Sequence, residues 1–424
     1  MPVWCPVERA ISSDPFHEVA INVWGLEPTG FIAEPSRLDR RSRQRQRRRR
    51  VRRLVVLAVV VVLLAPAVYS YTTTMLQPSS LPLWPRSVEW LRAHHGNWLV
   101  DEAEHYYYSW KAPKKGGPQL VSLPTVGLGA VSTTRATPRP RLAVWPLRIK
   151  SVFAHPLPGE GAWLGTGPVV RGRQPVLVTE FRTEVDYPRI VAYVAWFDHT
   201  RTSVAFYPGR YEPPSAPVRG PMSVPYDQRW RLLATFNGGF IYRDGHNGSS
   251  INGTMYEPLK DGLATLIAYR DGRVDVRAWT GGPVAGSHIA FARQSLPLIV
   301  DHGRLNPALN DSSQWGFTLG NAVRVWRTGA GIDRKGNLIY AAADGQTVVT
   351  LAKILQRAGA VRAMQLDINP EWPTLITYTH RGGLGPVKVV PNYQQSVTRY
   401  LVPDDRDFFA VYRRTPGPID VPFK

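Results

Sequence analysis

Cysteine is almost absent from this chain, because Cys5 is the single cysteine among 424 residues. An intramolecular disulfide is therefore impossible, and a zinc site built from cysteine ligands is excluded. The fold has to be stabilised by its apolar core instead. Apolar residues make up 43% of the chain and aromatic residues 11%, which suits a well-buried core and argues against a wholly disordered chain.

Several motifs of well-known chemistries are missing as well. The sequence contains no G-x-x-x-x-G-K-S/T, no G-x-S-x-G and no H-E-x-x-H, so nucleotide hydrolysis, serine-esterase and zinc-protease activities lose their usual support. Four residues could act as ligands of a hard cation, but nothing in their spacing is diagnostic. They are Asp301, His302, Asp344 and Asp367. We assign no metal site from the sequence, and the cofactor is unknown at this stage.

Acidic residues are outnumbered, with 32 Asp and Glu against 52 Lys and Arg, which gives a net charge of +20. Residues 1–53 hold 12 Arg and 6 acidic residues, a net charge of +6, so the rest of the chain carries +14 (40 basic minus 26 acidic). An excess of this size favours an anionic neighbour such as lipid head groups, a phosphate-bearing polymer or nucleic acid.

One long apolar run is present. Residues 54–71 (LVVLAVVVVLLAPAVYSY) are 18 residues without a charge, about 27 Å as a helix, close to the roughly 30 Å hydrocarbon core of a bilayer. We predict a single transmembrane helix over 54–76. A cleaved signal peptide is the alternative, and it is disfavoured because 53 residues precede the run and no clear A-x-A site follows.

The segment before the run, residues 37–53, contains 11 arginines. The positive-inside rule keeps such a block cytoplasmic, which places the C-terminal part outside the cell membrane. Beside a spanning helix, topology and contact with anionic lipid explain the arginines, so we expect no nucleic acid as a partner.

Composition divides the chain into five parts. We expect a disordered cytoplasmic tail, a transmembrane helix, juxtamembrane helices with a linker, a folded domain and a C-terminal tail, over 1–53, 54–76, 77–139, 140–414 and 415–424. The Trp and Tyr residues of 87–113 suit either the membrane interface or packing on the domain. His94 and His95 are adjacent and do not share a helix face, which disfavours a metal site there.

The expected domain consists of many short strands, rich in β-branched and aromatic residues and bounded by Gly, Asp or Pro. They cover 175–183, 190–198, 202–209, 264–279 (a hairpin about Asp271 and Gly272), 322–333 and 337–345. A helix over 346–361, with Thr347 as N-cap and Gly359 at its end, precedes a strand over 362–367. The pattern predicts an α+β fold, a β-rich mixed sheet domain with one strand–helix–strand unit, preceded by the transmembrane helix.

The stretch TFNGGFIYRDGHNGSSINGT, residues 235–254, is the first candidate site. Its apolar lead-in ends at Asn237 and two glycines, whose backbone amides could face an anion or a sugar hydroxyl. A tight hairpin turn is the alternative, since Asn-Gly is a strong turn signal. A second glycine-rich loop at 248–253, which holds Asn252, favours a binding site.

Two arginines accompany apolar strands. Arg293 precedes the strand that ends at Asp301 and His302, and Arg327 opens a glycine-spaced strand. A planar guanidinium group suits the recognition of phosphate or carboxylate. An ordinary surface arginine is the alternative at each position.

The run AMQLDINPEW, residues 363–372, ends an apolar strand at Asp367. A carboxylate delivered to a pocket in this way could be a general acid or a nucleophile, with Glu371 as the second carboxylate. Trp372 adds an aromatic face of the kind that stacks on sugar rings. Alternatively, Asp367 only caps the turn before Pro370.

In their order, these stretches resemble the phosphodiester glycosidase family. The similar segments are FNGGF, RQSLPLIVDHG, RTGAGIDRKGNLIYAAADG, LAKILQRAGAVRAMQLD and NYQQSVTRYLVPDDRDFFAVYR, which lie within residues 230–413. The resemblance implies a mixed α/β fold and the hydrolysis of a sugar-1-phosphate diester.

The resemblance also implies site residues. Asn237, Gly238 and Gly239 match the family's Asn-Gly-Gly-Phe loop, Arg327 its arginine before the Gly-Ile-Asp strand, Asp344 its strand-end aspartate, and Asp367 the aspartate of its Leu-Asp-Gly-Gly-Gly-Ser motif. After Asp367 the chain departs from this family motif, because INPEW (residues 368–372) replaces the glycines and the serine. Pro370 removes a backbone donor and stiffens the turn, so the pocket is expected to be altered.

Two functions remain open from the sequence. The first is a membrane-anchored, extracytoplasmic hydrolase of a phosphate-linked glycan or cell-envelope polymer. Its catalytic residues would be Asp367, Glu371 and Asp344, and its substrate-binding residues Asn237, Gly238, Gly239, Arg293, Arg327, Asn252 and Trp372. The second is a non-catalytic envelope-glycan binding or scaffold protein of the same fold. A module that binds mainly protein or lipid is the third alternative.

Overall fold

The computed structural model describes residues 37–79, 81–124, 145–216, 218–245, 247–311, 314–316, 324–391 and 395–415. The expectations for residues 1–36, for most of the linker and for the end of the chain lie outside these ranges. The chain divides into two compact units, Met1–Val68 and Tyr69–Lys424. All the strands, and the candidate site with them, belong to the second unit.

The first helix is longer than the apolar run that predicts it. Helix α1 covers Arg37–Leu76, 40 residues, and continues through Pro66. Its part from Gln44 to Leu76 is long and apolar enough to cross a membrane, by length and composition only. Residues 37–53, expected as part of a disordered tail, are helical instead. Arginine, glutamine and leucine are good helix formers, so a helix that begins in the apolar run extends into them at little cost.

Two short helices follow, as the sequence predicts: α2 covers Leu83–Ala93 and α3 covers Asn97–Lys111. They are separated at Gly96, where an added Cβ would lie 2.4 Å from the Leu91 side chain. The His94 ring stacks on Trp90, with 4.3 Å between the ring centroids. Across the described ranges, no group of three His, Cys, Asp or Glu side chains is arranged to hold a metal ion.

The largest sheet has eight strands, and each strand pairs with its neighbours in antiparallel fashion. Its order is β1 (Leu164–Thr166), β2 (Val176–Arg182), β3 (Val191–Phe197), β14 (Leu338–Gln346), β13 (Val325–Asp333), β15 (Ala360–Gln365), β11 (Val300–Asp301) and β12 (Arg304–Leu305). Because β14 and β15 both pair with β13, they run in the same direction as each other.

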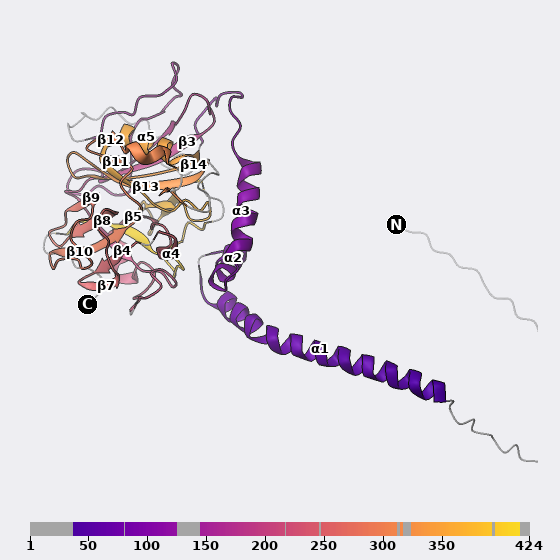
Figure 1. Cartoon of the computed structure of the whole chain (residues 1–424). Helices are drawn as coiled ribbons and strands as arrows, with labels where there is room; N and C mark the ends of the chain where they lie inside the picture. The colour runs from indigo at the N-terminus through magenta and orange to yellow at the C-terminus, as the bar shows by residue number, and fades with distance from the viewer. Residues whose placement is uncertain are drawn as a thin grey trace, which may run out of the picture. The chain divides into compact units, whose positions relative to one another are not determined.

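Helix α5 (Val348–Arg357) connects β14 to β15 across β13 and completes the predicted strand–helix–strand unit (Figure 1). Thr347 caps it as expected, since its side chain and that of Thr350 each accept a hydrogen bond from the other residue's backbone N–H. Gly359, at φ 101°, ends the helix. The apolar side of α5 packs on the three strands. The crossover therefore delivers the end of β15, and Asp367 after it, beside β13.

Two five-stranded antiparallel sheets complete the domain. The second sheet has the order β7 (Thr254–Glu257), β6 (Ser249–Ile251), β10 (Ile289–Gln294), β8 (Ala264–Tyr269) and β9 (Val274–Ala278), and the third has β17 (Pro386–Lys388), β16 (Leu375–Tyr378), β5 (Leu232–Asn237), β18 (Phe408–Arg413) and β4 (Thr202–Tyr207). Short helical turns occur at η1 (Tyr226–Arg231), α4 (Tyr242–Gly245) and η2 (Pro307–Asn310). The predicted hairpin at Gly272 is formed by β8 and β9.

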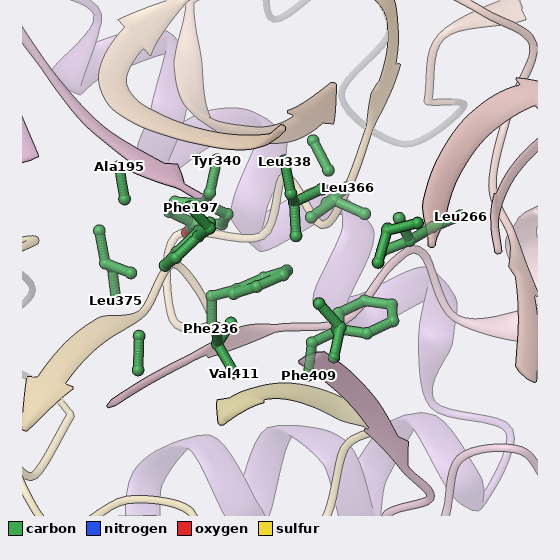
Figure 2. Packing of buried hydrophobic residues seen from close by; sticks show 14 of the residues in the cluster. Ala195, Phe197, Phe236, Leu266, Leu338, Tyr340, Leu366, Leu375, Phe409 and Val411 are labelled. Carbon is green, nitrogen blue, oxygen red and sulfur yellow. The ribbon is translucent and has the colours of Figure 1, made fainter. Parts of the chain in front are cut away.

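The main hydrophobic core takes side chains from all three sheets. Figure 2 shows Phe236 of β5 among Phe197, Tyr340 and Phe409, with ring centroids 6.1, 5.0 and 5.1 Å away. A second cluster fills the space between the eight-stranded sheet and α5. The β-rich fold with one strand–helix–strand unit is thus confirmed. The core includes Phe236 and Leu366, the residues directly before Asn237 and Asp367.

Candidate active site

The Asn-Gly-Gly stretch ends β5, the central strand of the third sheet. The side-chain oxygen of Asn237 accepts hydrogen bonds from the Tyr340 hydroxyl (2.7 Å) and the Thr374 backbone N–H (3.2 Å), and its amide donates to Thr328 Oγ1 (3.0 Å). Tyr340 and Thr328 belong to β14 and β13, so Asn237 joins two sheets. Its polar atoms are engaged by the protein, and in this structure Asn237 fixes the loop.

Gly238 and Gly239 lie against buried charges, and neither takes a positive φ. The Gly238 N–H donates to the Asp407 carbonyl oxygen (3.0 Å), and an added Cβ on Gly238 would lie 2.1 Å from Asp407 Oδ1. At Gly239, a Cβ would meet the Arg293 guanidinium at 3.5 Å, an ordinary contact distance. Glycine is therefore required at 238 by the close approach of Asp407.

Asp367 lies two residues beyond β15 and is buried. Its Oδ2 accepts a hydrogen bond from Arg406 Nη2 at 2.7 Å, and its Oδ1 accepts one from the Asn369 N–H at 2.9 Å. The Asp367 side chain therefore caps the following turn. The Asp367 N–H also contacts the Asn-Gly-Gly loop, because it donates a hydrogen bond to the Gly238 carbonyl oxygen (3.3 Å). Burial raises the pKa of the Asp367 carboxyl, and the Arg406 charge opposes that shift.

Arg406 is the cation that pairs with Asp367, and its side chain is also buried. Its Nε and Nη1 have no hydrogen-bond partner within the described residues, while Nη2 bonds to Asp367. Burial lowers the pKa of this guanidinium, but the charges of Asp367 and Glu212 outweigh burial and hold the pKa above its ordinary value. Arg406 thus has spare donors of the kind that bind phosphate.

Arg293 forms a second ion pair beside the first. Its Nε lies 2.5 Å from Asp407 Oδ2, and both side chains are about 1% exposed. The remaining guanidinium nitrogens donate to Asn247 Oδ1 (2.7 Å) and to the Phe240 carbonyl (2.8 Å), and the group lies 3.9 Å from the Tyr242 ring centroid. Arg293 thus lies at the Asn-Gly-Gly loop, and its guanidinium donors are occupied by protein groups.

Glu212 adds a third carboxylate to this neighbourhood. Its Oε2 accepts a hydrogen bond from the Tyr242 N–H at 3.1 Å, and the side chain is buried. Burial raises the pKa of Glu212 to about 7, although the charge of Arg406 acts in the opposite direction. A group with this pKa can hold and release a proton near neutral pH.

Arg327 is buried in β13 with neutral partners. Its Nε donates to the Gln346 carbonyl and its Nη1 to Gln365 Oε1, both at 3.0 Å. Burial lowers its pKa to about 10. Successive side chains of a strand point to opposite faces, so Arg327 points away from the face on which Thr328 contacts Asn237. The structure therefore does not bring the Arg327 guanidinium to Asp367.

Two other predicted residues lie apart from Asp367. Asp344 is exposed on β14, on the far side of β13 from β15, and accepts a hydrogen bond from the Gly345 N–H (2.7 Å). Asn252 and Gly253, at φ 51° and 83°, form the tight turn between β6 and β7. The glycine-rich loop at 248–253, which was expected to favour a binding site, is therefore a hairpin turn at Asn252.

Glu371 and Trp372 lie in the turn after Asp367. The Glu371 N–H donates to Asn369 Oδ1 (3.1 Å), and the side chain is half-buried. Trp372 is buried, with the guanidinium groups of Arg399 and Arg406 at 5.1 and 4.9 Å from its ring centroid. Cations thus occupy the position over the ring that a sugar was expected to take.

The segment before α2 packs against the loop that carries Arg406. Ser79 Oγ donates to Asp405 Oδ2 (3.2 Å), and Arg210 joins the Pro78 carbonyl to Asp405. The charge of Glu89, in α2, raises the pKa of Asp367. Helix α2 therefore lies close enough to influence the candidate site.

Two surface cavities, of about 490 and 580 Å³, are lined by other parts of the domain, around α5 and around the β13–β14 turn. None of the charged residues around the Asn-Gly-Gly loop lines them. The predicted residues thus converge only in part, and the two charged ones that lie at the loop, Asp367 and Arg293, are paired with Arg406 and Asp407.

The sequence analysis did not single out Arg406, Asp407 or Glu212. The first two belong to the run Asp404–Asp407, whose four charged residues directly precede the apolar strand β18. A run of charged residues is usually exposed to solvent, so the sequence alone does not indicate that this run is buried. The signal that could have found them is a run of charges of both signs immediately before a buried strand.

The fold and the site define a β-rich domain of three sheets with a buried carboxylate–arginine centre at the ends of β5 and β15. Residues 231–367, from the start of β5 to Asp367, match the phosphodiester glycosidase family. The family resemblance is therefore confirmed over this part of the chain. No curated protein matches the chain.

Solved structures are similar at low identity. The catalytic domain of zebrafish N-acetylglucosamine-1-phosphodiester alpha-N-acetylglucosaminidase, described as auto-inhibited by its pro-peptide, is 17% identical with a TM-score of 0.40, and the match covers 59% of this chain and 87% of that one. A hypothetical protein from Synechocystis is 13% identical with a TM-score of 0.36, over 57% of this chain and 63% of that one.

Proposed function

We propose that this protein is a membrane-anchored hydrolase similar to phosphodiester glycosidases, acting outside the cell membrane on a phosphate-linked glycan or envelope polymer. The observation that carries the proposal is the buried Asp367–Arg406 pair beside Gly238 and Gly239. Asp367 and the two glycines lie inside the stretch that matches the family. A carboxylate can act as nucleophile or base in glycosidic bond cleavage, and a guanidinium with spare donors can bind a phosphate group.

The two carboxylates have different tasks in this proposal. Asp367, paired with Arg406, is the nucleophile or base, and Glu212, with a pKa of about 7, is the proton donor to the leaving oxygen. Glu371 is the other candidate for the second carboxylate. Arg406 Nε and Nη1 bind the phosphate oxygens, a role first expected of Arg293 and Arg327.

A non-catalytic glycan-binding protein is the second candidate. It is favoured by the replacement of the Gly-Gly-Gly-Ser segment with residues 368–372 and by the guanidinium groups over Trp372. Such a protein would keep the fold and the anionic ligand without turnover.

The membrane location rests on α1 and on α3. Tyr106 and Trp110, here called the aromatic stripe, lie four residues apart on one face of α3 and are 78% and 80% exposed. Aromatic side chains next to a membrane-spanning helix favour the head-group region of a bilayer. We propose that the stripe lies there, with the arginine-rich end of α1 in the cytoplasm.

The test is turnover by the full-length protein in detergent micelles, with sugar-1-phosphate diesters as substrates. Asp367→Asn should lower kcat/KM at least about a hundredfold, whereas the exposed Asp227→Asn should leave it unchanged. Because Asp367 is buried, thermal unfolding of both variants is measured in parallel. Turnover that survives in a folded Asp367→Asn variant overturns the proposal, and glycan binding without turnover establishes the second candidate.

A further inference from the structure

A groove of about 580 Å³ lies at the turn between β13 and β14, on a part of the domain distant from Asp367. Five cationic side chains line it: Arg148, Lys150, Arg334, Lys335 and Arg357. Trp145, which is 46% exposed, lies among them. We call this the basic groove.

Two of its guanidinium groups are held by backbone carbonyls. Arg148 Nε and Nη2 donate to the Glu160 carbonyl oxygen at 3.1 and 2.9 Å, while the Glu160 carboxylate pairs with Arg182. Arg357 Nη2 donates to the Lys150 carbonyl at 2.7 Å. Carbonyl partners fix the position of a guanidinium but do not neutralise its charge, so both groups keep a net attraction for an anion.

Asp333 is the one carboxylate among the described residues that line the groove. Its Oδ2 accepts hydrogen bonds from Trp196 Nε1 (3.1 Å) and Asn337 Nδ2 (2.8 Å), and its Oδ1 accepts them from the Lys335 and Asn337 N–H groups (2.8 and 2.9 Å). These donors hold Asp333 within the turn, where it makes no ion pair with the cations of the groove.

The groove is connected to the candidate site by one strand. Asp333 at the groove and Thr328, whose hydroxyl donates to the Asp367 carbonyl oxygen, both belong to β13. They are five residues apart, which is roughly 17 Å at the rise of an extended strand. A small substrate cannot reach both places, but a polymer can.

We propose that the basic groove is an accessory binding site for a phosphate-bearing glycan chain. The phosphates bind the five cations, and a sugar ring stacks on Trp145. The proposal rests on the proposed function, because the polymer bound in the groove would also carry the sugar-1-phosphate bond that is cleaved at Asp367. Among the described residues that line the groove, Trp145 is the one exposed tryptophan, which favours a glycan over single-stranded nucleic acid, since the latter is usually bound on several aromatic side chains.

The experiment measures binding by the full-length protein in micelles, with a synthetic oligomer of sugar-1-phosphate units and with a single-unit diester. The double variant Arg334→Glu/Lys335→Glu should bind the oligomer at least about tenfold more weakly, with a smaller dependence on salt, and the single-unit diester unchanged. The matched control is Arg304→Glu/Arg381→Glu, which changes the charge equally at exposed positions outside the groove. Trp145→Ala should weaken binding of the oligomer but not of inorganic polyphosphate.

The proposal is overturned if the groove and control variants lose the same affinity, since the net charge alone would then explain binding. It is overturned too if single-stranded DNA or vesicles of anionic lipid bind more tightly than the oligomer in a groove-dependent manner. Failure of the proposed function is a different result, namely no cleavage of either substrate. Oligomer binding that depends on the groove would still support the accessory site.

Discussion

Arg293 and Asp407 form an ion pair of 2.5 Å in which both side chains are about 1% exposed, directly beneath the Asn-Gly-Gly loop. A charge buried to this degree is tolerated only with its partner. The pair therefore supports the loop that carries the candidate site, and it can be tested by separating the two charges.

Asp407→Asn should lower the free energy of unfolding by about 3–5 kcal/mol, because it leaves the Arg293 guanidinium buried without a counter-charge. The double variant Arg293→Met/Asp407→Leu should lose less than the sum of the losses of Arg293→Met and Asp407→Leu. Chemical denaturation measures both. The exposed pair of Asp271 and Arg273 provides the control, since Asp271→Asn should leave the unfolding midpoint unchanged. Equal losses at the two pairs would contradict the role of burial.

Adjacent glycines allow a sharper test of the loop. Gly238→Ala should destabilise the protein by about 1–3 kcal/mol or more, because its methyl group would lie 2.1 Å from Asp407 Oδ1. Gly239→Ala, with 3.5 Å to Arg293, should stay within about 1 kcal/mol of the parent. Thermal unfolding compares them, and similar stabilities of the two variants would show that the close approach of Asp407 is not what excludes a side chain.

Glu212 should make stability depend on pH. Its pKa is raised from 4.5 to about 7 in the folded protein, so the folded state binds the proton more tightly than the unfolded state. Its contribution is fully present below pH 4.5 and is lost as the pH rises through 7. Glu212→Gln removes this loss, so the variant should gain up to about 3 kcal/mol relative to the parent between pH 4.5 and 8. Denaturant unfolding over that range checks the difference, with the exposed Glu102→Gln as control. A constant difference across the range would show that Glu212 is already ionised at low pH.

The aromatic stripe can be tested with one fluorophore. In a Cys5→Ser background, Tyr106→Cys is labelled with a dye that responds to polarity, and the full-length protein is placed in vesicles of anionic lipid. Dye emission should shift to the blue and be quenched by lipids that carry a quencher near the head group. A dye at the exposed Arg381→Cys should remain in water. Identical spectra at the two positions would rule out insertion of the stripe.

The sequence predicted the strand–helix–strand unit well, because its signals are local. The Thr347 cap and the apolar face of α5 are read directly from spacing. The expected strand over 362–367 is shorter at its end, and β15 stops at Gln365, so Asp367 enters the site from a turn.

The partners of the site residues could not be predicted, because they depend on contacts between distant segments. Asp367 meets Arg406, 39 positions along the chain, and Arg293 meets Asp407, 114 positions along. No periodicity encodes such pairs. For the same reason, Arg327 was expected with Asp367, whereas the alternation of β13 directs its side chain to the other face.

The length of α1 has a mechanical consequence. Forty residues of helix measure about 60 Å, roughly twice the thickness of a hydrocarbon core. If residues 54–76 span a bilayer as proposed above, the remaining 17 helical residues, 37–53, would extend the helix by about 25 Å and carry 11 arginines beyond the hydrocarbon core. An acidic surface on that side of the bilayer would then meet the positive charges of a helix that projects from the membrane.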